Sequence, residues 1–465
     1  MSKNIDLTSG SIANSLIKLS LPIMGTSFLQ TAYNITDMFW IGQVGTKEVA
    51  AVGTAGYFSW LAMAFIMISR IGAQVKVAQN LGRKDVHSVK NYVTTSVQLN
   101  IILALSYTFF VFVFRKQLIG FFNLGDPEVF AMAETYLVIT CIGFAAYFIN
   151  PVFTAIFNGL GNSSTPLKIN TLGLVFNLVL DPILIMGFGP IKPMGVAGAA
   201  IATVLAQIIV SLCFIIRIIR GKEEYLKFRL FQKINFDYLR AIIHLGVPVA
   251  IQEGLFTAFA MLIARIIAVW GAEAIGVQKI GSQIEAISWM TAGGLSTALS
   301  AFIGQNYGAG KKDRIIKGYI YTMIMAFVVG LGATLLLVIL GGDIFKVFIP
   351  NDPKSIAIGS EYLKILGYSQ LFMCIEITTA GAFNGLGKTL LPSIISIVFT
   401  GLRVPSAELL STQTALGLNG VWWSISLSSV IKGILLMVAF IYLLKTGRIC
   451  AFDKKNLDQL ELNDC

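Results

Sequence analysis

The pentapeptide Phe-Asn-Gly-Leu-Gly occurs twice in this chain, at 157–161 and at 383–387, and a proline follows each copy at the same distance. The two copies are 226 residues apart, and other landmarks recur at that same offset: Pro22 with Pro248, Gly45 with Gly271, Gln79-Asn80-x-Gly82 with Gln305-Asn306-x-Gly308, and Pro166 with Pro392. A Gly-x-x-Gly pair at 195 recurs at 417, an offset of 222, as expected if one loop is four residues shorter. This constant spacing predicts an internal duplication.

The composition is that of a membrane protein. Of the 465 residues, 55% are hydrophobic and 13% are charged, whereas an average soluble domain is about 25% charged. A bilayer core about 30 Å thick needs about 20 apolar residues for each helix. Twelve apolar stretches can be read, near 16–41, 51–75, 92–114, 130–155, 168–188, 195–219, 240–268, 276–303, 317–341, 360–383, 391–411 and 420–445.

Each repeat therefore holds six apolar stretches, and an even number gives both halves the same orientation in the membrane. We predict an all-α polytopic membrane protein with twelve transmembrane helices. Its two six-helix bundles are expected to be related by a pseudo-twofold axis along the membrane normal. The expected division is an N-terminal lobe at 1–220, a basic linker at 221–239, a C-terminal lobe at 240–446 and a tail at 447–465.

Basic residues alternate between the loops. Four Lys or Arg lie in 76–91, seven in 217–240 and four in 305–317, whereas none lies in 412–419. The positive-inside bias then predicts that both termini are cytoplasmic and that the protein is a multi-pass protein of the plasma membrane. The same topology accounts for the net charge of +11, so no nucleic-acid partner is expected.

Several chemistries are not indicated by the sequence. The five cysteines are far apart with only two histidines to join them, so neither a disulfide framework nor a zinc site is expected. No Gly-x-x-x-x-Gly-Lys-Ser/Thr loop occurs, and the Phe-Asn-Gly-Leu-Gly segments read as turns. No catalytic constellation is apparent, and we predict that the protein is not an enzyme and has no cofactor.

Polar residues inside the first repeat's spans are functional candidates, because an ionised side chain at the bilayer centre costs about 3 kcal/mol. Asp37 ends a polar stripe on the first span that also contains Gln30, Tyr33 and Asn34, at helical spacing. This face is expected to line a cavity.

Asn177 and Asp181 lie four residues apart in the fifth span, and Pro182 frees a main-chain carbonyl nearby. Carboxylate, amide and carbonyl oxygens are hard ligands that suit a sodium ion or a proton. We predict a cation site of Asp37, Asn177 and Asp181. The alternative is that these groups only hydrogen-bond to one another and hold helices together.

The second repeat carries different acids, namely Glu253, Glu285 and Glu376, and its counterpart of Asp37 is Ile263. Arg403 stands at the repeat position of Asn177 and is a candidate counter-ion for Glu376 or Glu408. We expect Glu253 and Glu376 to form a site in the C-terminal lobe, and leave structural pairing and function open for Glu285.

Two prolines, Pro22 and Pro248, fall early in the first span of each repeat. Proline frees a carbonyl four residues back and kinks or hinges the helix. A hinge is one reading and a static kink is the other.

With these features, the chain resembles the multidrug and toxic compound extrusion (MATE) family over about 12–445. The resemblance implies two six-helix bundles facing a central cavity, and exchange of Na⁺ or H⁺ for cationic amphipathic organic compounds. It adds Thr203 to the cation cluster of Asp37, Asn177 and Asp181. It also implies that Glu253 and Glu376 match a seventh-helix glutamate and a tenth-helix acid of some branches, although Glu376 is Glu where a common pattern has Asp.

The predicted function is therefore secondary active efflux by alternating access, with the bilayer and small organic cations as partners and a monomer as the expected state. The alternative within the same superfamily is a flippase for lipid-linked oligosaccharides, which should favour a basic cavity. A channel is a third class, but midplane carboxylates beside kinked helices favour alternating access.

Overall fold

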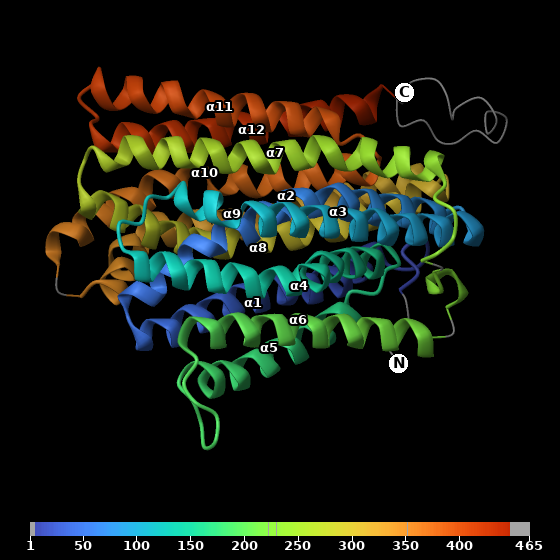
Figure 1. Ribbon diagram of the computed structural model, residues 1–465. Helices are drawn as coiled ribbons and strands as arrows, with labels where there is room; N and C mark the ends of the chain where they lie inside the picture. The colour runs from blue at the N-terminus through green and yellow to red at the C-terminus, as the bar shows by residue number, and fades with distance from the viewer. Residues whose placement is uncertain (1–4, 222, 229, 351, 447–465) are drawn as a thin grey trace. The chain divides into compact units, whose positions relative to one another are not determined.

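The computed structural model of the chain describes residues 5–221, 223–228, 230–350 and 352–446 (Figure 1). The predicted tail at 447–465, with Cys450 and Cys465, lies outside the described residues.

Twelve α-helices make up almost all of the described chain, and they confirm the twelve predicted spans. They are α1 (Ile12–Val44), α2 (Thr46–Gly82), α3 (Val86–Gly120), α4 (Pro127–Gly159), α5 (Ser164–Ile185), α6 (Gly195–Arg220), α7 (Phe236–Ala268), α8 (Ala272–Gly308), α9 (Lys312–Phe348), α10 (Pro353–Gly385), α11 (Leu390–Thr412) and α12 (Leu418–Lys445). A short 3₁₀ helix, η1 (Glu224–Leu226), lies in the predicted linker. The fifth span was predicted three residues too long, since α5 ends at Ile185 before the turn at Gly187.

The helices repeat as the landmarks predicted. Equivalent helices have matching lengths, with 33 residues in α4 and α10 and 37 in α2 and α8. The helices α4 and α10 begin in the same way, with a proline in the first turn and an aspartate, Asp126 or Asp352, as N-cap. The carboxylate of each aspartate accepts a hydrogen bond from a first-turn N–H, which satisfies a donor that the helix leaves open.

The structure explains why the pentapeptide is repeated. A Cβ atom on Gly159 would lie 2.7 Å from the Gln74 carbonyl oxygen, and one on Gly385 would lie 2.6 Å from that of Ser300. Two residues on, Gly161 and Gly387 both have φ of +78°, a left-handed conformation that favours glycine. The motif is thus a helix contact followed by a turn, in both repeats.

Eleven of the twelve helices are long and apolar enough to cross a membrane by length and composition. The helix outside that set is α10, which carries Lys354, Glu361, Lys364 and Glu376 along its length.

The described chain divides into two compact units. The first holds Ile5 and Leu21–Ala250, and the second holds Asp6–Ser20 and 251–446. The helices α1 and α7 each change units close to their proline, at 20/21 beside Pro22 and at 250/251 near Pro248. The domain limits drawn at 220 and 240 stay a prediction.

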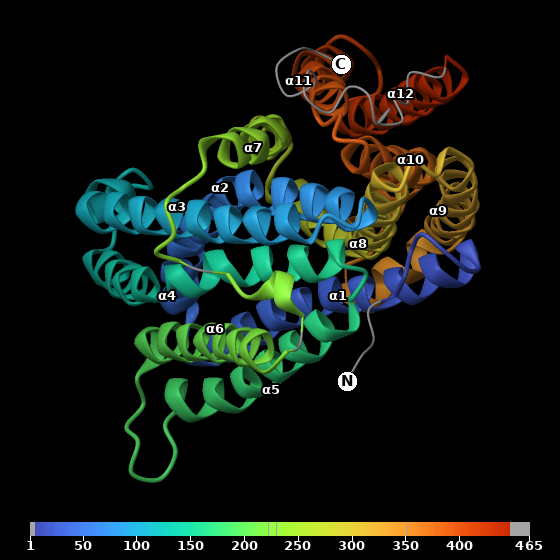
Figure 2. The same cartoon turned by 90° about the vertical axis from the view of Figure 1, so that its right-hand side faces the viewer.

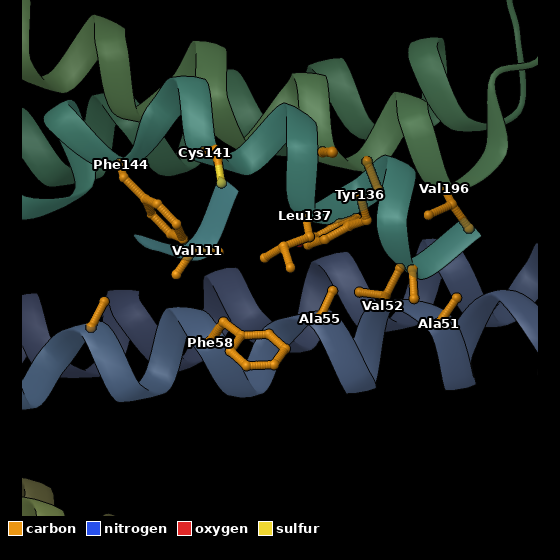
Figure 3. Packing of buried hydrophobic residues seen from close by; sticks show 14 of the residues in the cluster. Ala51, Val52, Ala55, Phe58, Val111, Tyr136, Leu137, Cys141, Phe144 and Val196 are labelled. Carbon is orange, nitrogen blue, oxygen red and sulfur yellow. The ribbon is translucent and has the colours of Figure 1, made fainter. Parts of the chain in front are cut away.

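In the first unit, α4 packs between α2, α3 and α6, and α5 lies against α6. Figure 3 shows Ala55 and Phe58 of α2 facing Tyr136 and Leu137 of α4 in the apolar core. In the second unit, α10 packs against α8, α9 and α12, and α11 lies beside α12 (Figure 2). The helices α4 and α10 are therefore the central helices of the two units.

Candidate functional site

The hydroxyl of Thr203 on α6 joins Asp37 on α1, in the first unit. Thr203 Oγ1 donates to Asp37 Oδ2 at 3.2 Å, and the Tyr33 hydroxyl donates to the Thr203 carbonyl oxygen at 3.3 Å. Tyr33 and Asp37 are four residues apart on one face of α1. The structure thus brings together two members of the predicted stripe and the threonine that the family resemblance added.

Asn177 and Asp181 of α5 are fully buried and directly bonded. The Asn177 side-chain amide donates to Asp181 Oδ1 at 3.0 Å, and neither residue exposes any surface. Pro182 lies inside α5, and the helix continues past it to Ile185. The i, i+4 spacing that the sequence showed is therefore a hydrogen-bonded pair.

The two pairs form one cluster, because the Asp37 carboxyl lies within interaction range of both Asp181 and Asn177. Three of its buried oxygens have no hydrogen-bond partner in the structure: Asp37 Oδ1, Asn177 Oδ1 and Asp181 Oδ2. Like charges this close resist joint ionisation, and unsatisfied buried oxygens are costly. The donor set therefore fits a monovalent cation, Na⁺ or H⁺, held by carboxylate, amide and hydroxyl oxygens.

Tyr136 of α4 belongs to this neighbourhood and was not predicted. It is buried, and it lies close enough to interact with Asp37, Asp181 and Thr203. Tyr136 stands at the start of the apolar run 136–139 and looks in sequence like an ordinary core aromatic, so only its hydroxyl could have marked it.

Two other residues of the predicted stripe on α1 are not part of this cluster. Gln30 and Asn34 are exposed positions of α1. That they line a cavity stays a prediction, as does the hinge at Pro22.

In the second unit, Glu376 of α10 is held by a lysine that the sequence reading did not single out. Lys432 Nζ of α12 lies 2.8 Å from Glu376 Oε1, with only 5% and 11% of the two side chains exposed. Arg403 of α11 was the predicted counter-ion for Glu376 or Glu408. It lies within electrostatic range of Glu376, but the ion pair is made by Lys432.

Arg403 instead donates to hydroxyls of α12, those of Ser428 and Ser429, the latter at 3.0 Å. Glu285 of α8 accepts from the Tyr362 hydroxyl at 2.5 Å and from the Gln370 amide at 3.2 Å. Both of its carboxylate oxygens are therefore satisfied by α10.

Glu253 lies on an exposed position of α7, five residues after Pro248. The structure brings Glu285, Glu376, Arg403 and Lys432 into one network. The shared C-terminal site of Glu253 and Glu376 stays a prediction.

The MatE family model matches residues 22–183 and 248–408, which covers one stretch in each repeat. The chain belongs to the MatE family. It is accordingly a multi-pass membrane transporter and not an enzyme.

Among curated relatives, a probable multidrug resistance protein NorM of Thermotoga maritima is 28% identical over 435 residues, covering 92% of each chain. A probable multidrug resistance protein YpnP of Bacillus subtilis is 26% identical, covering 95% of this chain and 96% of that protein. A crystal structure of MATE in complex with MaD3S superposes with a TM-score of 0.89 at 22% identity, covering 96% of this chain and 99% of the other, and this likeness shows the fold.

Proposed function

We propose that this transporter exports cationic amphipathic organic compounds in exchange for Na⁺ or H⁺. The observation that carries the proposal is the pair of aspartates in the first unit, the half-buried Asp37 and the fully buried Asp181, each with one buried carboxylate oxygen that has no hydrogen-bond partner. The names of the two relatives as multidrug resistance proteins support the same direction of transport.

Exchange needs a cation that binds one conformation better than another, because equal affinity for both would shift nothing. A cation bound by Asp37 and Asp181 would neutralise their charge. The attraction of the first unit for an organic cation would then fall, and the cation would favour release of the substrate. Coupling thus follows from competition for the same negative charge.

The helix α1 would couple neutralisation of Asp37 to a change of conformation. Thr203 bonds Asp37 on α1, and α1 contains Pro22, where a proline removes a backbone hydrogen bond and permits bending. A bound cation would alter the hydrogen bonds on one side of this proline, and the helix could bend there.

We place the transporter in the plasma membrane with both termini cytoplasmic, on the distribution of basic loops. The substrate is a delocalised organic cation, which carboxylates attract by charge and aromatic rings by cation–π interaction. We propose that the protein works as a monomer. Gln30, Asn34 and the acids of the second repeat are proposed to contact substrate.

The test is efflux of a fluorescent organic cation, ethidium, from proteoliposomes under an imposed Na⁺ or H⁺ gradient. Asp37→Asn keeps the size of the side chain and removes its charge, and we expect it to abolish gradient-driven efflux. Asp343→Asn is the matched control, because Asp343 is 71% exposed and pairs with Lys346 one turn away.

Wild-type gradient dependence in the Asp37→Asn protein would contradict the proposal. Movement of a lipid-linked sugar without any efflux of ethidium would replace it by the flippase, and conduction without exchange would replace it by a channel.

A further inference from the structure

Two acids of the second unit, Glu285 and Glu376, are matched by basic side chains of the same unit. Glu376 faces the ammonium of Lys432 at 2.8 Å, and the Lys432 Nζ also lies 3.5 Å from the Thr400 hydroxyl. Glu285 and Arg403 complete the set, and Arg403 lies within electrostatic range of both acids. Two carboxylates and two bases sum to no net charge.

Burial makes this match necessary. A carboxylate taken out of water costs several kcal/mol unless an opposite charge and hydrogen bonds compensate for it. With 11% of its side chain exposed, Glu376 needs a positive partner, and the ammonium of Lys432 provides one. An ammonium group carries the same charge as a sodium ion and donates hydrogen bonds as a protonated carboxyl does.

A comparison of the two repeats shows that Glu376 and Lys432 are both charged where their counterparts are both neutral. The counterpart of Glu376, 226 residues earlier, is Asn150, and the counterpart of Lys432, 222 residues earlier, is Val210. Both are buried, and Asn150 is satisfied by neutral groups: its amide donates to Gln207 Oε1 at 2.8 Å, and its Oδ1 accepts from Ser211 at 2.7 Å. An apolar and an amide residue in one unit are thus an ion pair in the other.

The cation cluster of the first unit likewise has no equivalent in the second unit. The counterparts of Asp37, Asn177, Asp181 and Thr203 are Ile263, Arg403, Ala407 and Ile425. None of these supplies an oxygen ligand from its side chain, and one is itself a cation.

We infer that Lys432 is a tethered replacement for an exchangeable monovalent cation at Glu376, so that this network of the second unit neutralises its own charge. Because the ammonium is attached to α12, it stays beside Glu376 at a high effective concentration, and a free cation competes poorly. Cation exchange then belongs to the first unit. This last step rests on the proposed function, whereas the role of Lys432 does not.

The experiment measures thermal unfolding of the purified full-length protein with NaCl, methylammonium chloride or the bulky N-methyl-D-glucamine chloride at equal ionic strength. Lys432→Ala removes the ammonium and leaves a space beside Glu376. We expect a lower Tm in N-methyl-D-glucamine and a saturable rise of a few degrees with Na⁺ or methylammonium, as binding to the folded state requires.

The double variant Glu376→Gln/Lys432→Ala removes the acid as well, and we expect it to regain Tm and to lose the cation-dependent rise. Lys346→Ala is the matched control, since Lys346 pairs with Asp343 on the surface of the same unit and should give no such rise. If Lys432→Ala cannot be purified without a small cation, recovery of folded protein with methylammonium supports the inference, and failure to recover it contradicts it.

No cation-dependent rise in a folded Lys432→Ala protein would overturn the inference, as would an equal rise in the double variant. Any rise in the wild type should be removed by Asp37→Asn and kept in Glu376→Gln. A wild type that shows neither this rise nor gradient-driven efflux would refute the proposed function, and the result for Lys432→Ala would still decide the inference.

Discussion

The two units share a scaffold and differ in how they balance buried charge. In the first unit, Asp37 and Asp181 are held by hydroxyl and amide groups and retain unpartnered oxygens. In the second unit, Glu376 has a lysine beside it and Glu285 has both oxygens bonded. The two repeats have kept the same helix packing, but polar residues at equivalent positions have different roles.

Beyond Asp37 itself, the largest effect on transport should come from the second acid of the first unit. Asp181→Asn removes the charge that shares the cluster with Asp37, and we expect gradient-driven ethidium efflux to fall at least about tenfold, the equivalent of about 1.4 kcal/mol. Membrane expression should stay near that of the wild type, because an amide can still bond Asn177. An equal loss of expression and efflux would argue that Asp181 only holds α5 in place.

A broken ion pair tests the second unit. Lys432→Ala leaves Glu376 buried without its partner, and we expect a loss of about 3–5 kcal/mol in the free energy of unfolding. Glu376→Gln/Lys432→Ala should recover most of that loss. Chemical unfolding of both proteins checks this, and additive losses in the double variant would show that the two groups are independent.

The shared scaffold predicts equal responses at equivalent glycines. Gly159→Ala and Gly385→Ala each push a methyl group against a backbone carbonyl that cannot move aside, at 2.7 and 2.6 Å. Each change should cost about 1–3 kcal/mol of stability. Thermal unfolding should give similar shifts for the two variants, and a large difference would mean that the repeats pack differently.

A smaller effect is expected at the hydroxyl that orients Asp37. Thr203→Val removes the donor at 3.2 Å and keeps the shape, so cation affinity should fall by about 1 kcal/mol. Thr203→Ser should restore it. The apparent affinity for Na⁺ or H⁺ in the efflux assay is the measurement, and a similar loss in Thr203→Ser would point to packing by the methyl group.

The smallest effect concerns an exposed acid. Lys47 Nζ lies 2.9 Å from Asp126 Oδ2. The hydrogen bond from Lys47 is the largest of the influences that hold the pKa of the Asp126 carboxyl below its usual value. A lowered pKa stabilises the fold above the unfolded-state value and ceases to do so as pH falls through the folded-state value. Asp126→Asn should therefore reduce Tm slightly at neutral pH and not in strong acid, with efflux unchanged at neutral pH. A loss of efflux would give Asp126 a role in transport.

Much of the fold could be predicted, because hydropathy and a constant offset of 226 are properties of the sequence itself. The spacing of Asn177 and Asp181 likewise predicts a contact within one helix. Contacts between helices depend on how each helix is rotated, which no local pattern specifies. The pairing of Glu376 with Lys432, 56 residues on, and the approach of Tyr136 to Asp37 could not be predicted for that reason.

The most direct measurement compares gradient-driven ethidium efflux in two variants reconstituted side by side, Asp37→Asn and Glu376→Gln/Lys432→Ala. The account predicts that efflux no longer responds to the Na⁺ or H⁺ gradient in Asp37→Asn. In the double variant the loss of Glu376 can lower the rate of efflux, but efflux still responds to the gradient. A response that persists in Asp37→Asn and disappears in the double variant would contradict it, and would assign cation exchange to the second unit.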